Sequence, residues 1–197
     1  MDCVIHAASD PRHSASVDIE GTRRLVDALR AGACRHLIYV SIVGVDKIPL
    51  RYYQHKYQAE QIVRTSGIPW SILRATQFHQ FVSGLLAMAA RVPALMPLPK
   101  GFRFQTVHVD EAAGRLLRCL DAGPSLRVDE FGGPEVLTLH DMAREWVAAR
   151  GLRRKIMDVP VPGGTAAAFR AGINLPSAGD RGSIRWADWL SGMLYSA

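Results

Sequence analysis

The chain is poor in cysteine. Only three cysteines occur among 197 residues, they are widely spaced, and none forms a Cys-x-x-C pair. Isolated thiols in odd number argue against a disulfide framework and favour a reduced, cytoplasmic protein. The seven histidines likewise show no spacing typical of metal ligands, so we expect no metal site.

Long hydrophobic runs are also absent. The most apolar stretch, residues 81–90, is about half as long as a bilayer span requires, and Arg91 and Pro93 follow it. It predicts a core helix or a helix that covers a substrate. The N-terminus carries Asp2 where a signal peptide has basic residues, so we expect neither a signal peptide nor a membrane-bound protein.

The net charge of +6 is not concentrated in any one segment. Basic residues occur singly or in short groups such as Arg153-Arg154-Lys155, and no basic stripe is interleaved with aromatic residues. This pattern argues against a nucleic-acid partner and leaves a small-molecule substrate as the expected ligand. The length and the 48% hydrophobic content indicate one globular domain, with at most a small appendage.

Three short apolar runs alternate with helical patterns over the first 80 residues. The runs are residues 2–9, 37–41 and 70–74, and helical spacing occupies residues 17–31 and 52–65. The order β-α-β-α-β predicts an α/β fold with a parallel sheet covered on both faces. Because such crossovers place successive strands in one sheet, we expect the first two strands to be parallel neighbours.

The later part of the chain is less regular. Prolines and glycines between residues 93 and 101 predict a loop, and residues 102–109 and 127–131 predict short strands. We expect Asp110 and Thr138 to be the N-caps of two further helices, and residues 165–171 to form a short helix in the C-terminal tail.

Small or polar residues follow each strand of the predicted sheet. Ligands in parallel sheets bind outside the carboxyl ends of the strands, so these residues are candidates for a binding site. They are His6, Ala7, Ala8, Ser9, Ser41, Thr76, Gln77, Phe78 and His79. The alternative for the first four is a tightly packed turn between strand and helix.

Several segments resemble the atypical short-chain dehydrogenase/reductases of the NmrA-like type. They are residues 4–8, 39–44, 66–78, 107–113 and 132–138, together with Lys56 and Glu60, in the order found in that family. The resemblance implies a Rossmann-like fold that binds NAD or NADP across the strand ends. We expect residues 1–140 to form the cofactor-binding part, with interleaved substrate segments, and residues 141–197 to form a C-terminal helical appendage.

The resemblance also implies roles for individual residues. Tyr52 and Lys56 lie four apart and share one face of a helix. Lys56 would contact the nicotinamide ribose and favour the Tyr52 phenolate, and Tyr52 would exchange a proton with the substrate, whose carbonyl Ser41 would bind. The alternatives are an exposed helix on which Tyr52 and Lys56 meet by chance, and a role for Tyr53 or Tyr57 in place of Tyr52.

The same resemblance assigns cofactor contacts to the residues that follow the strands. The expected set is His6, Ala7, Ala8, Ser41, Lys56, Ala75, Thr76, Gln77 and Phe78. Members of the family begin with a glycine-rich phosphate turn and two further strands, whereas no G-x-G-x-x-G occurs in this chain. We therefore expect either a start site that has been assigned too late or a truncated relative.

Three functions remain open at this point. The leading one is an NAD(P)-dependent oxidoreductase acting on a small carbonyl, quinone or alkene. The second is a non-catalytic NAD(P)-binding regulator or redox sensor, and the third is a truncated product that binds no cofactor. An N-terminal strand without its neighbour would also expose an apolar edge, so we expect self-association through that edge.

Overall fold

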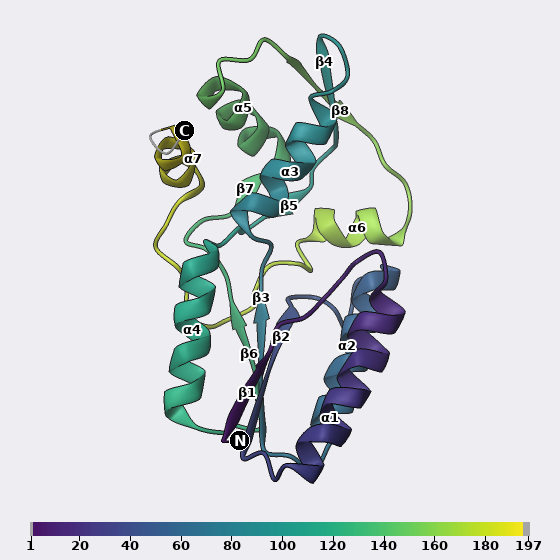
Figure 1. The fold of residues 1–197 in the computed structure, drawn as a ribbon. Helices are drawn as coiled ribbons and strands as arrows, with labels where there is room; N and C mark the ends of the chain where they lie inside the picture. The colour runs from purple at the N-terminus through teal and green to yellow at the C-terminus, as the bar shows by residue number, and fades with distance from the viewer. Residues whose placement is uncertain (1, 195–197) are drawn as a thin grey trace.

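The structure is a computed structural model and describes residues 2–194. Its main sheet has four parallel strands in the order β1-β2-β3-β6 (Figure 1). They are β1 (Cys3–His6), β2 (His36–Ile42), β3 (Trp70–Ala75) and β6 (Val128–Phe131). Val4 pairs with Leu37, which confirms that the first two strands are parallel neighbours. Within the described residues, β1 lies at one edge of this sheet.

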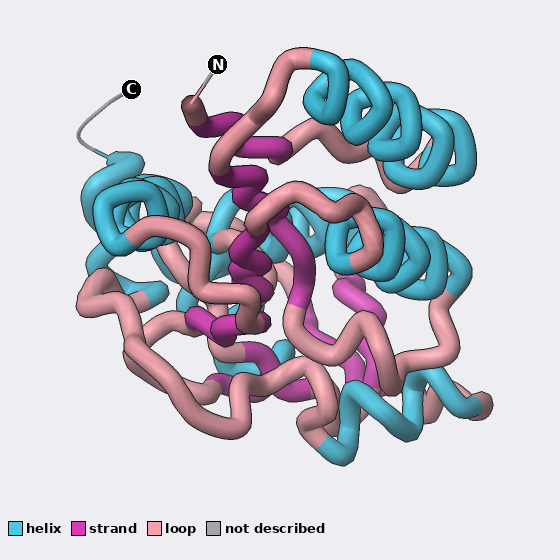
Figure 2. The backbone as a smooth tube through the Cα atoms, turned by 90° about the horizontal axis from the view of Figure 1, so that it is seen from below, coloured by secondary structure: helices cyan, strands magenta, loops and turns pink. Residues whose placement is uncertain are grey.

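Helices cover both faces of the sheet. α1 (Gly21–Ala31) and α2 (Arg51–Arg64) pack on one face and α4 (Val109–Ala122) on the other. Figure 2, seen from below, shows the strands between these helices. Val26 and Val63 of the helices form a buried cluster with Leu37 and Ile72 of the strands. Burial on both faces accounts for the continuous apolar runs in the sequence and confirms the expected Rossmann-like α/β fold.

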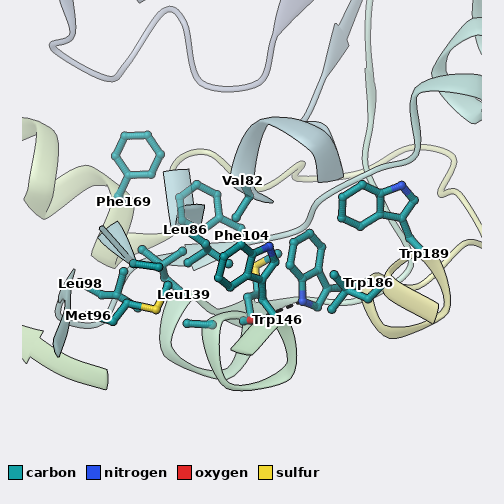
Figure 3. Close-up of a cluster of buried hydrophobic side chains, with 14 of the residues drawn as sticks. Val82, Leu86, Met96, Leu98, Phe104, Leu139, Trp146, Phe169, Trp186 and Trp189 are labelled. Atoms are coloured by element: carbon teal, nitrogen blue, oxygen red, sulfur yellow. Dashed lines mark hydrogen bonds between the residues drawn. The ribbon is translucent and has the colours of Figure 1, made fainter. Parts of the chain in front are cut away.

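A second group of elements lies beyond the carboxyl ends of the strands (Figure 1). It contains α3 (His79–Ala89), β4 (Leu95–Pro99), β5 (Arg103–Phe104), β7 (Leu137–Thr138), α5 (Leu139–Ala149), β8 (Lys155–Val159), α6 (Gly164–Ala171) and α7 (Trp186–Leu194). Its core is rich in aromatic residues, with Trp146 and Trp186 beside Leu86 and Leu139 (Figure 3). The expected helical appendage over residues 141–197 contains a strand as well, and it shares this core with α3.

The proline-rich segment after α3 is a strand and not the expected loop. β4 pairs in parallel with β8 in a two-stranded sheet, in which Pro97 lies opposite Met157. Proline is tolerated there because each strand of such a pair has a free edge on which no N–H is needed. The strand expected over residues 102–109 is correspondingly short and is limited to β5.

Two helix starts differ from the sequence expectation. His108, and not Asp110, is the N-cap of α4, and its Nδ1 accepts from the Asp110 N–H at 3.3 Å. Thr138 is confirmed as the N-cap of α5, because its Oγ1 accepts from the Asp141 N–H at 3.1 Å. The helix expected from residue 17 begins as a π-helical segment, η1 (Ala15–Glu20), which buries Asp18 before α1 starts.

A buried ion pair fixes α2 against the sheet. Arg74 on β3 donates two hydrogen bonds to the Glu60 carboxylate of α2, at 2.9 and 2.7 Å, and a third to Asp46 at 3.0 Å. Glu60 is fully buried, so this fork-shaped pairing satisfies a charge that water cannot reach. The pairing holds the helix that carries Tyr52 and Lys56 in a defined position on the sheet.

No helix within residues 2–194 is both long enough and apolar enough to cross a membrane.

Candidate functional site

The candidate site lies where β1, β2 and β3 end, below α6. The carboxyl ends of these parallel strands meet at one edge of the sheet, and α6 lies beyond that edge, above α2 in Figure 1. Phe169 of α6 approaches Tyr53 of α2, with 6.5 Å between the ring centroids. The C-terminal part of the chain therefore forms one wall of the region in which the sequence predicts a ligand.

Ser41 is buried, and its hydroxyl group has no hydrogen-bond partner within residues 2–194. Only 2% of the residue is exposed. Buried polar groups are rarely left unpaired, and such a group at a strand end is suited to bind a ligand atom. This geometry is compatible with the carbonyl contact that the sequence assigns to Ser41.

Tyr52 is half-buried, and its hydroxyl lies 2.7 Å from the Ser9 Oγ. Burial raises the pKa of Tyr52, the Ser9 hydrogen bond opposes this rise, and the nearby Asp18 charge adds to it. The phenol is thus the form present at neutral pH. It borders a pocket of about 360 Å³ whose lining also includes Arg12, Arg51 and His55.

Lys56 is buried, with 3% of its side chain exposed. Its ammonium group contacts Val40, Asp18 and Tyr39 and not the Tyr52 hydroxyl. Its Nζ donates to the Val40 carbonyl at 2.7 Å, lies 3.6 Å from the Asp18 carboxylate and sits 4.3 Å above the Tyr39 ring. Burial lowers the Lys56 pKa to about 8, although the Asp18 charge opposes this shift. The expected direct support of a Tyr52 phenolate by Lys56 is therefore absent from the described contacts, and the Tyr52 pKa is raised.

The residues at the end of β1 and directly after it fall into two groups. His6 is buried and its Nε2 lies 2.8 Å from the Thr22 Oγ1, so its ring is engaged with α1. Burial also lowers the His6 pKa, which keeps the ring neutral. Ala7 and Ala8 are exposed, and their short side chains leave room for a ligand to approach the backbone.

The residues at the end of β3 and directly after it are mostly buried among other parts of the protein. Ala75 and Thr76 are 3% exposed, and the Thr76 hydroxyl donates to the Gln105 carbonyl at 2.6 Å. The Gln77 Nε2 donates to the Tyr53 hydroxyl at 2.9 Å, whereas the Gln77 Oε1 has no partner within residues 2–194. Phe78 packs in a small apolar cluster. Gln77 is thus the member of this group with a free polar atom.

Two competing tyrosines have different surroundings. Tyr53 is 5% exposed, and burial raises its pKa to about 12, which leaves it a weak acid held by Gln77. Tyr57 lines a separate pocket of about 400 Å³ beside Asp46 and Lys47. Of the three tyrosines on α2, only Tyr52 bonds a residue that follows β1.

Sequence reasoning missed the role of Asp18 and underrated Ser9. Asp18 is fully buried, accepts from the Ser9 Oγ at 2.6 Å and pairs with Lys56. An acid between Val17 and Ile19, at the start of the residues that show helical spacing, was the available signal. No group of three potential metal ligands occurs within residues 2–194.

The residues present fit the nicotinamide half of an NAD(P) molecule. Ser41 and Gln77 carry buried polar atoms that lack a partner within residues 2–194, and Ala7 and Ala8, directly after β1, are exposed and have short side chains. The Lys56 ammonium has three N–H donors, of which Val40 and Asp18 occupy two. We assign no residue to the pyrophosphate, because the chain has no G-x-G-x-x-G turn.

Comparison with known proteins gives a family for the N-terminal part. Residues 1–85 match the family described as NAD(P)H-binding. No curated protein matches the chain. The family match covers β1, β2, β3 and α2, which are the elements that carry the candidate site.

Solved structures with the same fold are numerous. An NADPH-dependent quinone oxidoreductase from Escherichia coli, complexed with NADPH, has 18% identity and a TM-score of 0.72, covering 98% of this chain and 75% of that chain. A nucleoside-diphosphate-sugar epimerase from Staphylococcus aureus has 16% identity and a TM-score of 0.73, covering 96% of this chain and 76% of that chain. At these identities the comparison shows the fold.

The structure has a Rossmann-like fold, and its first 85 residues match a family of NAD(P)H-binding proteins. This match fits the resemblance to NmrA-like dehydrogenase/reductases, and for the matched part it fits the expected cofactor class, NAD or NADP.

Proposed function

We propose that the protein is an NAD(P)-dependent oxidoreductase that reduces a small carbonyl, quinone or alkene. The observation that carries the proposal is the position of Tyr52, a protonated phenol that lines a pocket and is linked through Ser9 and Asp18 to the buried Lys56. Reduction of such substrates requires a placed proton donor in addition to the cofactor.

The residues of the chain have distinct tasks in this reaction. The bound cofactor supplies the hydride. For a carbonyl substrate, the Ser41 hydroxyl donates a hydrogen bond to the oxygen, and Tyr52 transfers its proton to that oxygen as negative charge develops there. The free N–H of Lys56 and the unpaired Gln77 Oε1 hold the nicotinamide end of the cofactor.

The pocket next to Tyr52 has basic residues that would influence which substrate binds, namely Arg12, Arg51 and His55. Glu20 is the only acidic lining residue of this pocket within the described part of the chain. A basic wall favours substrates that carry a polar or anionic group.

A non-catalytic NAD(P)-binding regulator is the second candidate. The close packing of Lys56 against Val40, Asp18 and Tyr39 favours it, because a lysine so engaged also serves to stabilise the fold. This function needs cofactor binding but no proton donor. Replacement of Tyr52 therefore distinguishes the two candidates.

The test compares Tyr52→Phe with Tyr57→Phe, a matched change on the same helix. Cofactor binding is titrated by NADPH fluorescence, and turnover is measured with a soluble quinone and a small aldehyde. We expect Tyr52→Phe to bind the cofactor normally and to lose about 100-fold or more in turnover, because the proton transfer acts mainly in the transition state. Tyr57→Phe should retain both properties.

Lys56→Ala provides the complementary arm. We expect weaker cofactor binding and no turnover, because Lys56 contributes a ground-state contact. Circular dichroism controls for folding, since the change leaves Asp18 without its counter-charge. Full turnover in Tyr52→Phe would refute the proposed enzyme and favour the regulator.

A further inference from the structure

Two segments far apart in the sequence meet at the end of the molecule that lies at the top of Figure 1. One is the C-terminal end of α3 with the turn before β4, and the other joins α5 to β8. The Lys155 N–H donates to the Ala94 carbonyl at 2.9 Å, and the Arg154 Nε donates to the Ala90 carbonyl at 3.1 Å. We call this surface, formed by residues 88–95 and 150–155, the tip.

The tip gathers basic residues that the sequence shows only as short separate groups. They are Arg91, Arg150, Arg153, Arg154 and Lys155. None of the five takes part in an ion pair within residues 2–194. Residues 75–109 and 146–157 contain no aspartate or glutamate, so the sequence around the tip supplies no carboxylate to neutralise these charges.

The basic side chains of the tip differ in how they are held. The Arg150 guanidinium lies 4.6 Å from the centre of the Trp146 ring, and Arg154 is bonded to the Ala90 carbonyl. Arg91, Arg153 and Lys155 are exposed. The tip therefore combines two cations in fixed positions with three that are available to a partner.

Exposed aliphatic side chains lie in the same two segments. Met88, Val92, Leu95 and Leu152 are each between 36% and 56% exposed. Residues 91–95 are exposed throughout, and Ala94 has a left-handed backbone with a φ of 59°, which turns the chain at this point. A projecting turn with aliphatic and basic side chains is suited to a surface that is anionic outside and apolar beneath.

We propose that the tip binds the anionic surface of a phospholipid bilayer. Basic side chains near such a surface are attracted to the lipid phosphates, and aliphatic side chains enter the boundary between headgroups and acyl chains. The binding is peripheral and reversible, because single side chains enter the bilayer and no whole helix does. It does not depend on the proposed function, and its tests use neither cofactor nor substrate.

Nucleic acid is the other polyanion that attracts basic surfaces. Proteins that bind single strands combine basic side chains with aromatic rings that stack on the bases. Residues 88–95 and 150–155 contain no aromatic residue, and their large apolar side chains are all aliphatic. The composition of the tip therefore favours lipid.

Flotation of the full chain with phospholipid vesicles tests the proposal. Vesicles of equimolar phosphatidylglycerol and phosphatidylcholine should bind the protein, whereas phosphatidylcholine alone should not. Added salt should weaken the binding, because it screens the charges. Arg153→Ala combined with Lys155→Ala should weaken it about 30-fold, the factor expected for two basic residues near an anionic surface. Absence of binding by the wild type would overturn the proposal.

Arg23→Ala combined with Arg24→Ala is the matched control. Both residues are exposed on α1, which lies beside the main sheet and away from the tip in Figure 1, and their loss changes the net charge equally. This variant should keep the wild-type affinity within about threefold, because salt screens charges far from the lipid. Equal losses in the two double variants would mean that net charge alone attracts the protein, and would overturn a specific role of the tip.

A second test follows the apolar contact. Val92→Trp adds a fluorophore to the turn, and the four native tryptophans are buried, so the added ring reports the tip. Its emission should shift to shorter wavelength on the anionic vesicles and should be quenched by brominated lipid. Val92→Ser combined with Leu152→Ser should weaken vesicle binding about tenfold. Both residues are exposed, and circular dichroism verifies that the variants fold.

Two further outcomes would overturn the proposal. One is an emission from Val92→Trp that the vesicles leave unchanged, since the tip would then not enter the bilayer. The other is tighter binding to a single-stranded oligonucleotide than to the vesicles, with loss of that binding in Arg153→Ala combined with Lys155→Ala. That result would assign the tip to nucleic acid.

Discussion

Loss of Arg74 should destabilise the protein more than any comparable change at the surface. Arg74 forms three hydrogen bonds to Glu60 and Asp46, and Glu60 is fully buried. Removal of the guanidinium in Arg74→Ala leaves the Glu60 carboxylate without its hydrogen-bonded partner in a place that water does not reach. Breaking a buried pair in this way costs about 3–5 kcal/mol.

That loss is large against the total stability of a typical domain, about 5–15 kcal/mol. For a chain of this size it corresponds to a decrease of about 6–20 °C in Tm. Urea unfolding and thermal melting, both followed by circular dichroism, measure the change. The experiment also tests the site, because Glu60 belongs to the helix that carries Tyr52 and Lys56.

Arg24→Ala is the matched control. Arg24 and Glu20 are an exposed pair 3.9 Å apart on successive helical turns, and such pairs contribute less than about 1 kcal/mol. Replacement of both Arg74 and Glu60 by apolar residues should recover part of the stability, because no unpaired buried charge remains at Glu60. Equal losses for Arg74→Ala and Arg24→Ala would refute the reasoning.

Two further predictions concern pH and association. His79 is fully buried between Thr106 and Ile184, and burial lowers its pKa from 6.5 to about 4. The unfolded chain therefore binds the proton more readily than the folded protein does. The free energy of unfolding should be unaffected by His79 above pH 6.5, and it should decrease by up to about 3 kcal/mol as the pH falls to about 4. Urea titrations of wild type and His79→Gln check this, and parallel declines in both would contradict it. We also propose that the free edge of β1 promotes self-association, because Ile5 on this strand is 39% exposed. The substitution Ile5→Lys should then shift any oligomer toward the monomer in size-exclusion chromatography. An oligomer that Ile5→Lys leaves unchanged would exclude this edge as the interface.

Local patterns in the sequence determined the framework of the fold. The alternation of apolar runs with helical spacing specified the parallel order of β1, β2 and β3, because buried strands and amphipathic helices have different periods. The sequence also predicted Thr138 as an N-cap, because a cap depends on a hydrogen bond to a backbone N–H only three residues away. The positions of Ser41, Tyr52 and Lys56 near the strand ends follow from the same local rules.

Only the tertiary structure decided how these side chains are paired. Ser9 and Tyr52 are 43 residues apart in the chain, and Lys56 turns toward Asp18 and Val40 and away from Tyr52. Spacing along one helix places two residues on the same face, but their partners depend on how that helix lies against other elements.

The same limit explains the missed strand pair. Prolines marked residues 93–101 as a loop, because the signal for β4 comes from its pairing with β8. That partner lies about 60 residues further along the chain, and its register depends on the packing of the second core around Trp146 and Trp186. Propensity and periodicity act over one element at a time, whereas burial and pairing between distant segments are properties of the folded chain.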